Sequence, residues 1–258
     1  MKMTALLLVG AIVLLAGPDP IVAAPPPGFT ALFNGADLAG WRGGITFDHR
    51  ELLALPPAKR TARIEQWTRT LIEKNPLTDR PHWHVEHGEL VNDGLGGYAT
   101  TERDYGDFEL VLEYKIAPLT DSGIYLRGVP QVQIWDPHRP DPKHNGNARG
   151  SGGLWNNAED SPGKYPLVVA DRSIGQWNHI RIVMTGEYVS VWLNQHLVVD
   201  HSILENYFDR NLPPEQRRPV PSRGPIQLQT HGGEIRWRHI FIREIESSEV
   251  TRILQQEK

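Results

Sequence analysis

The sequence predicts an all-β fold, an antiparallel β-sandwich or jelly roll, with one helical segment inserted near its N-terminal end. From His82 onward, short runs of alternating apolar and polar residues follow one another, separated by turns that contain Gly or Asn. A convincing helical spacing of apolar residues occurs in one segment, before residue 76. The 258 residues are 39% hydrophobic and 22% charged, which fits one large domain.

The first 24 residues are typical of a secretory signal peptide. Lys2 precedes an apolar run of roughly a dozen residues, which a Gly-Pro pair then interrupts. This run is too short to span a bilayer, which takes about 20 residues. We therefore expect a mature chain that begins near Pro25, is secreted or periplasmic, and has no stable membrane anchor after cleavage. A retained anchor is the alternative.

Residues 25–250 are expected to form a single domain. Its first part, residues 28–41, indicates an edge strand and an Asn-Gly turn that leads into the core. Residues 48–76 form the helical insertion, in which Trp67 and Leu71 recur at helical spacing. We expect this segment to pack on the sandwich.

The rest of the domain alternates between strands and turns. Residues 83–92 contain two short strands around a Gly turn, and residues 108–116 place apolar and polar side chains on opposite faces. Residues 178–200 predict a hairpin followed by a second turn, and residues 226–245 predict two more strands. This spacing of strands indicates the antiparallel sandwich.

Two long stretches rich in Gly, Pro and Asn interrupt the strand pattern, at residues 137–164 and 202–223. Loops of this length inside a compact domain are commonly functional or disordered. Strands of the same pattern lie on both sides of each, so neither stretch is a domain linker.

Composition excludes several classes of function. The net charge of −4 provides no basic field for nucleic acid. The absence of cysteine excludes thiol catalysis, disulfides and thiolate metal sites. His82 and His84 would share one side of a strand but lack a clear third ligand, so we expect no metal there. A calcium ion held by loop carbonyls and Asp136 or Asp160 stays an open alternative, although no loop has the regular acidic spacing of a calcium site. No phosphate-binding glycine loop, GxSxG elbow or HExxH helix is present, and we expect no cofactor. The sequence does not indicate the oligomeric state.

Polar side chains recur at alternate positions on three strands between Asp107 and Asp136. The pairs of matching parity are Glu113 with Lys115, Tyr125 with Arg127, and Gln131 with Gln133. If neighbouring strands pair in register, these residues form one contiguous patch. Such a patch is either a water-facing sheet or a sugar-binding surface, and the nearby rings of Tyr125 and Trp155 favour the sugar.

A late strand carries a second candidate group. Gln229 and His231 have matching parity and stand before a Gly-Gly turn. The histidine suits acid or base chemistry near neutral pH, or else it bonds to backbone at the strand end. Arg238, beside Trp237, would pair with a carboxylate or stack on a ring.

Several segments in order resemble the 3-keto-disaccharide hydrolase domain family. They are FTALFNGADLAGW, GELVNDGLGGYATTERDYGDFELVLEYKI, DSGIYLRG, VQIWD, VWLNQHLVVD and GPIQLQTHGGEIRWRHIFIREI. The resemblance covers residues 28–245 except the helical insertion. It implies a concanavalin A-like β-sandwich.

The resemblance also implies action on small carbohydrates whose C3 hydroxyl has been oxidised to a ketone. The ketone acidifies the C2 proton, so a base can remove it, the C1 group leaves, and water adds back. This chemistry requires a base, an electrophile at the C3 oxygen and a proton source for the leaving group. As a hypothesis, the residues divide into a catalytic set and a binding set. In the catalytic set, Glu113 or His231 is the base or acid, and Arg127 or, alternatively, Lys115 steadies the enolate oxygen. The binding set is Lys115, Tyr125, Gln133, Asp136, Gln229, Arg238 and Trp155.

Three positions depart from the family's pattern: Asp121 replaces Asn, Gln131 replaces Glu, and Thr230 replaces Asp. The second change removes a carboxylate from the expected site. The sequence therefore leaves two functions open, an exported hydrolase or lyase of 3-keto-glycosides and a non-catalytic carbohydrate-binding module. A single pocket containing Glu113, Arg127 and His231 would favour the enzyme.

Overall fold

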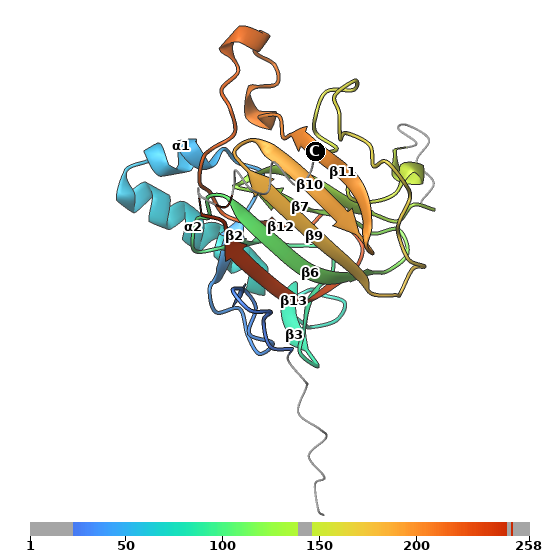
Figure 1. The fold of residues 1–258 in the computed structure, drawn as a ribbon. Helices are drawn as coiled ribbons and strands as arrows, with labels where there is room; N and C mark the ends of the chain where they lie inside the picture. Colours follow the sequence, from blue (N-terminus) through green and yellow to red (C-terminus); the bar gives the residue numbers. More distant parts are fainter. Residues whose placement is uncertain (1–22, 139–145, 247–248, 250–258) are drawn as a thin grey trace, which may run out of the picture.

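Two antiparallel sheets stack face to face in the computed structural model, which describes residues 23–138, 146–246 and 249 (Figure 1). The larger sheet contains β1 (Thr30–Ala31), β3 (Trp83–Glu86), β4 (Glu89–Asn92), β6 (Phe108–Ile116), β9 (Asn178–Thr185), β10 (Tyr188–Leu193), β11 (His196–Ile203) and β13 (Ile235–Glu244). The smaller sheet contains β2 (Trp41–Gly44), β5 (Tyr98–Thr101), β7 (Asp121–Leu126), β8 (Val129–Trp135) and β12 (Gln227–Leu228). The predicted all-β sandwich is confirmed.

The strand order brings distant parts of the sequence together. The larger sheet runs β11-β10-β9-β6-β13-β4-β3, with β1 also paired to β13, and the smaller runs β2-β5-β12-β7-β8. The late strand β12 lies between β5 and β7, where Gln227 is opposite Tyr125. The C-terminal strands β12 and β13 therefore belong to different sheets.

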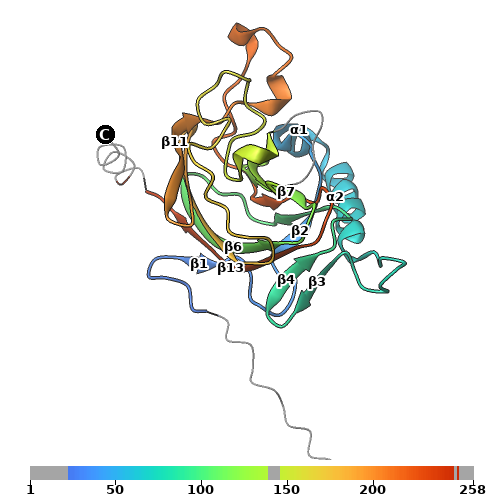
Figure 2. The same cartoon turned by 90° about the vertical axis from the view of Figure 1, so that its right-hand side faces the viewer.

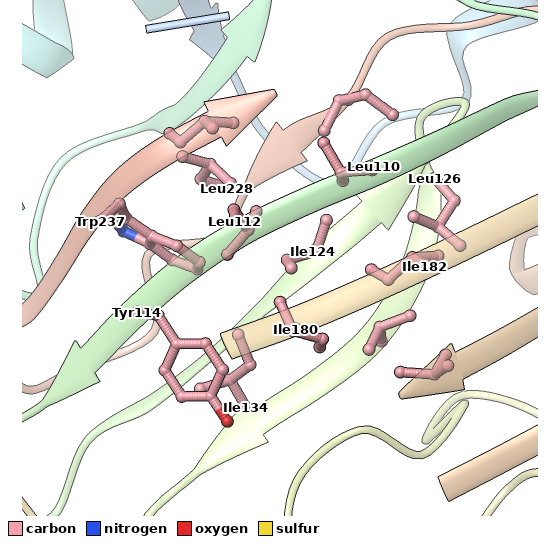
Figure 3. Packing of buried hydrophobic residues seen from close by; sticks show 14 of the residues in the cluster. Leu110, Leu112, Tyr114, Ile124, Leu126, Ile134, Ile180, Ile182, Leu228 and Trp237 are labelled. Carbon is pink, nitrogen blue, oxygen red and sulfur yellow. The ribbon is translucent and has the colours of Figure 1, made fainter. Parts of the chain in front are cut away.

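The core lies between the two sheets and follows the alternation of each strand. Figure 3 shows the side chains that meet there: Leu110, Leu112 and Tyr114 of β6, Ile124 and Leu126 of β7, Ile134 of β8, Ile180 and Ile182 of β9, Leu228 of β12 and Trp237 of β13. All of them are almost fully buried. Because successive side chains of a strand point to opposite faces, the intervening residues face outward.

The expected patch across three strands is wrong. Strand β6 pairs with β9 and β13 in the larger sheet, whereas β7 and β8 pair with each other in the smaller sheet. Leu112 and Tyr114 point into the core, so Glu113 and Lys115 face away from the smaller sheet. The prediction that alternate residues of one strand share a face was correct, but this alternation does not say which sheet the strand joins.

The inserted segment forms two helices, α1 (His49–Ala54) and α2 (Pro57–Ile72). Asp48 caps α1 by accepting a hydrogen bond from the Arg50 amide at 2.9 Å. Pro57 is the first residue of α2, a position where proline is favoured because no amide hydrogen is needed. In the described part of the chain, neither helix has the length and apolar character needed to cross a bilayer.

Helix α2 packs directly on β2. A Cβ added at Gly43 would lie 2.1 Å from the backbone carbon of Trp67, so a glycine is needed for this close approach. The Thr68 hydroxyl accepts a hydrogen bond from the Gly43 amide at 2.9 Å. The helix is thus fixed against the edge of the smaller sheet.

The two long loops contain short 3₁₀ helices, η1 (Asn147–Arg149) in the first, and η2 (Tyr207–Asp209) and η3 (Pro214–Gln216) in the second. Figure 2 shows that the described parts of these loops and the two α-helices flank the face of the smaller sheet that is turned away from the larger one. The predicted signal peptide, residues 1–24, lies outside the described residues except for its last two.

Candidate active site

A polar pocket of about 250 Å³ lies on the outward face of the smaller sheet. Its volume corresponds to roughly eight water molecules of the liquid at about 30 Å³ each, which suits one sugar ring. The residues that line it come from three strands, the segment after β12, both long loops and the segment before α1: Thr46, Tyr98, Asp121, Tyr125, Pro130, Gln131, Gln133, Trp135, Trp155, Asn156, Tyr207, Gln229 and His231.

Three glutamine amides form the floor of the pocket. Gln131 and Gln133 point outward from β8 because Val132 and Ile134 occupy the core side. Gln133 Nε2 donates to Asp121 Oδ1 at 2.8 Å, and Gln131 Nε2 donates to Gln133 Oε1. The Oε1 atoms of Gln131 and Gln229 are buried and have no hydrogen-bond partner among the described residues. An unpaired buried acceptor is unfavourable, so these two oxygens lower the stability of the pocket floor.

Asp121 and His231 form a contact at the edge of this floor. His231 Nδ1 lies 3.0 Å from Asp121 Oδ2, and the imidazole is 61% exposed. A carboxylate at Nδ1 favours the tautomer that carries hydrogen there, which leaves the lone pair on Nε2. Asp121 is itself oriented by Gln133. The arrangement is that of an oriented general base.

A chain of hydroxyl groups forms the wall next to the inserted segment. Thr46 Oγ1 lies 2.7 Å from the Tyr125 hydroxyl and 3.1 Å from the Tyr98 hydroxyl. Burial raises the pKa of Tyr125, and the neighbouring Tyr98 raises it further. Tyr125 therefore keeps its proton at neutral pH and can donate a hydrogen bond.

Two tryptophans form the opposite wall. The rings of Trp135 and Trp155 meet edge to face, with centroids 4.8 Å apart. Trp135 Nε1 donates to the Gly150 carbonyl at 2.8 Å, which fixes the ring against the first long loop. Apolar ring faces beside hydrogen-bonding groups suit a sugar.

The structure brings five of the predicted site residues into this pocket: Tyr125, Gln133, Trp155, Gln229 and His231. The remaining five lie elsewhere. Glu113, Lys115 and Arg238 are on the outer face of the larger sheet, where Glu113 Oε2 is 2.5 Å from Arg238 Nε. Lys115 and Arg238 both stack on the Trp177 ring. Glu113 and His231 are therefore on opposite sides of the sandwich.

Arg127 is not in the pocket because it occupies the tight turn between β7 and β8, where its φ angle is 53°. Its side chain is 1% exposed and donates to the carbonyls of Gly106, Gly186 and Pro221 at 2.8, 2.7 and 3.2 Å. It also pairs with Asp107 at 2.5 Å. Burial lowers the pKa of Arg127, an effect that Asp107 opposes. This residue holds three loops together.

Asp136 is also outside the pocket. Its two carboxylate oxygens accept hydrogen bonds from the amides of Leu119 and His138 at 2.9 and 2.8 Å. The side chain is almost fully buried. Asp136 therefore fixes the loop before β7 to the end of β8.

Sequence reasoning missed the role of Asp121 and of Thr46, Tyr98 and Tyr207. A signal was present for Asp121, since it shares the parity of Tyr125 on β7. No sequence signal connects Thr46 or Tyr207 to the site, because each lies on a segment without strand alternation. In the described ranges, no three His, Cys, Asp or Glu side chains gather in a way that could hold a metal ion.

Comparison with solved structures shows a shared fold. A protein from Parabacteroides distasonis ATCC 8503, described as a candidate glycosyl hydrolase, is 22% identical, with a TM-score of 0.57 and 85% of each chain covered. A second protein of that organism with the same description is 19% identical, with a TM-score of 0.48 over 85% of this chain and 94% of the other. A third is 24% identical, with a TM-score of 0.47 over 67% and 93%.

No curated protein matches the sequence. Residues 28–243 match the family described as the 3-keto-alpha-glucoside-1,2-lyase-like domain. The match spans both sheets and all thirteen residues of the pocket, and it confirms the resemblance seen in the sequence. The chain therefore belongs to this family of 3-keto-alpha-glucoside-1,2-lyase-like domains and is a carbohydrate-active protein.

Proposed function

We propose that the protein cleaves 3-keto-glycosides in the pocket on the smaller sheet, with His231 as the base and Asp121 as the residue that orients it. The observation that carries the proposal is the 3.0 Å contact between His231 Nδ1 and Asp121 Oδ2 at the edge of a sugar-sized pocket. Family membership supports a glycoside-acting enzyme. We further propose that the protein is exported and acts on small carbohydrates.

The reaction begins with removal of the proton on C2. His231 Nε2 takes this proton, the C2 electron pair forms the C1–C2 double bond, and the C1–O bond breaks with its electrons on the leaving oxygen. The leaving oxygen receives a proton, so the products of this step are an unsaturated 3-keto sugar and an alcohol. Water then adds its hydroxyl at C1 and a proton at C2, which gives net hydrolysis.

Negative charge develops on the C3 oxygen when C2 loses its proton, so hydrogen-bond donors must face that oxygen. Among the described residues that line the pocket, the Tyr125 hydroxyl supplies such a donor. Burial keeps Tyr125 protonated.

The second candidate function is carbohydrate binding without catalysis. It is favoured by the separation of Glu113 and Arg127 from His231, because the expected cluster of a carboxylate, a cation and a histidine does not form. In this alternative the amides and tryptophans hold an unmodified glycan, and the Asp121–His231 contact is structural.

The experiment is incubation of the purified protein with 3-keto-trehalose, with release of 3-ketoglucose followed by chromatography. We expect turnover by the wild type, a large loss in His231→Ala, and a loss in Asp121→Asn of about 10²-fold or more, the lower range for a general base. The Glu113→Gln variant is the matched control. Binding of unmodified glycans with no turnover of any 3-keto-glycoside would contradict the proposal and support the binding module.

A further inference from the structure

The row of aromatic rings in the pocket continues beyond it. Trp135 and Trp155 line the pocket, and the Trp155 ring also meets the Tyr165 ring edge to face, with centroids 6.0 Å apart. Tyr165 does not line the pocket; it belongs to a second cavity that lies next to it. Three rings therefore pass from the candidate catalytic pocket into a neighbouring space.

The second cavity shares Trp155 and Asn156 with the first, so the two are adjacent. Its volume is about 540 Å³, compared with about 250 Å³ for the pocket that contains His231. The ratio of these volumes, 540 to 250, is about two. If the first pocket holds one keto-sugar ring, the second has room for two sugar rings.

Buried and stacked cations hold the rings of this row in place. Lys164 Nζ donates to the carbonyls of Trp155 and Asn157 at 2.8 and 3.1 Å and lies 4.5 Å from the centre of the Trp155 ring. Arg149 lies 4.1 Å from the centre of the Tyr165 ring. Ring faces that are fixed before a ligand arrives reduce the entropy lost on binding.

Polar groups complete the second cavity. Glu205, Arg210 and Arg217 of the second long loop line it. An aromatic row beside hydrogen-bonding groups is the lining that suits sugar rings. Both charge signs are present, so the cavity fits a neutral polar chain.

We propose that this second cavity is a leaving-group subsite for an oligosaccharide of two sugar units, which makes a trisaccharide with a terminal 3-keto ring the preferred substrate. The inference rests on the proposed function, because it places the keto ring beside His231. The leaving chain then follows the row from Trp155 to Tyr165. Energy from binding this chain serves to position the bond that breaks.

The test compares 3-keto-maltose with 3-keto-maltotriose, each oxidised at C3 of the non-reducing terminal ring. We expect kcat/KM to rise at least about tenfold from the disaccharide to the trisaccharide, the effect of roughly one well-packed group in a specificity pocket. Equal values of kcat/KM would overturn the subsite and leave the proposed function intact. Cleavage of neither substrate, nor of 3-keto-trehalose, would instead contradict the proposed function.

A pair of aromatic variants places the effect in the second cavity. Tyr165→Ala removes the ring that only this cavity contains, and we expect it to lower kcat/KM about tenfold for the trisaccharide and much less for the disaccharide. Tyr188→Ala is the control, because Tyr188 stacks on His201 and lines neither cavity. An equal loss on both substrates in Tyr165→Ala, or a full trisaccharide preference in that variant, would contradict the assignment.

Discussion

The placement of Arg127 leads to a prediction that separates a structural role from a catalytic one. Replacing Arg127 with Met removes the side chain that donates to the carbonyls of Gly106, Gly186 and Pro221. A buried acceptor that loses its partner costs about 1–3 kcal/mol. Two of these three bonds lie partly within reach of water, so water can hydrogen-bond to their carbonyls in the variant and reduce the cost. We therefore expect the free energy of unfolding to fall by about 3–5 kcal/mol, the range for breaking a buried ion pair.

The assay is thermal unfolding of Arg127→Met beside the wild type, followed by kinetics well below both transitions. A shift of about 2–4 °C per kcal/mol for a domain of this size predicts a Tm lower by about 10 °C. We expect kcat on 3-keto-trehalose to change little in the folded fraction. The exposed Arg172→Met is the control and should stay within about 0.5 kcal/mol of the wild type. An unchanged Tm with a large loss of kcat would refute the reasoning and indicate a catalytic role for Arg127.

Two further predictions concern the walls of the site. Arg218 and the backbone hold the pKa of Asp209 at about 2, below its ordinary value of 3.8, so its contribution to stability is present above about pH 4 and lost as the pH falls toward 2. We expect Asp209→Asn to lower the free energy of unfolding at pH 7 by about 1–2 kcal/mol, allowing for the half-exposed Arg218; a difference that stays constant from pH 7 to pH 2 in chemical denaturation would contradict this. Gly43→Ala should lower the free energy of unfolding by about 1–3 kcal/mol because its Cβ would overlap the Trp67 backbone, and a crystal structure with α2 unmoved would show the packing argument to be wrong.

Strand alternation predicted the local part of the site. It correctly assigned Gln131 and Gln133 to one face of β8, because alternation within a strand is a property of neighbouring residues. Gln229 and His231 both line the pocket, but they follow β12, which ends at Leu228, and do not lie on a strand as expected. The family resemblance supplied the fold, since the order of its segments covers most of the domain. These two sources together gave five of the residues that line the pocket.

Sheet membership was the part that the sequence did not contain. Strand β6 has the same alternation as β7 and β8, but its partners are β9 and β13, which follow it by more than 60 residues. Glu113 therefore faces the wrong side of the sandwich for a role beside His231. The predicted place of Arg127 in the site was wrong for another reason. This residue lies in a turn with a positive φ angle, where the alternation of strand residues no longer applies.

The partner of His231 could not be found by pattern because the contact joins residues 110 positions apart. Asp121 begins β7, and His231 follows β12, which pairs with β7 in the smaller sheet. The substitution of a carboxylate at position 121 was visible in the sequence as a departure from the family. The structure gives that carboxylate a partner, because Asp121 Oδ2 lies 3.0 Å from His231 Nδ1.

The most direct test of proton removal by His231 is cleavage of 3-keto-trehalose in D₂O, with the isotope at C2 of the released 3-ketoglucose measured by NMR or mass spectrometry. Elimination followed by addition of water places solvent deuterium at C2, and an incubation without enzyme corrects for spontaneous exchange. In the wild type and in Glu113→Gln, we predict that deuterium enters C2 at the rate of product formation. In His231→Ala and Asp121→Asn, we predict that deuterium incorporation and product formation are both lost. Product that retains hydrogen at C2, or equal rates in His231→Ala and the wild type, would contradict the account.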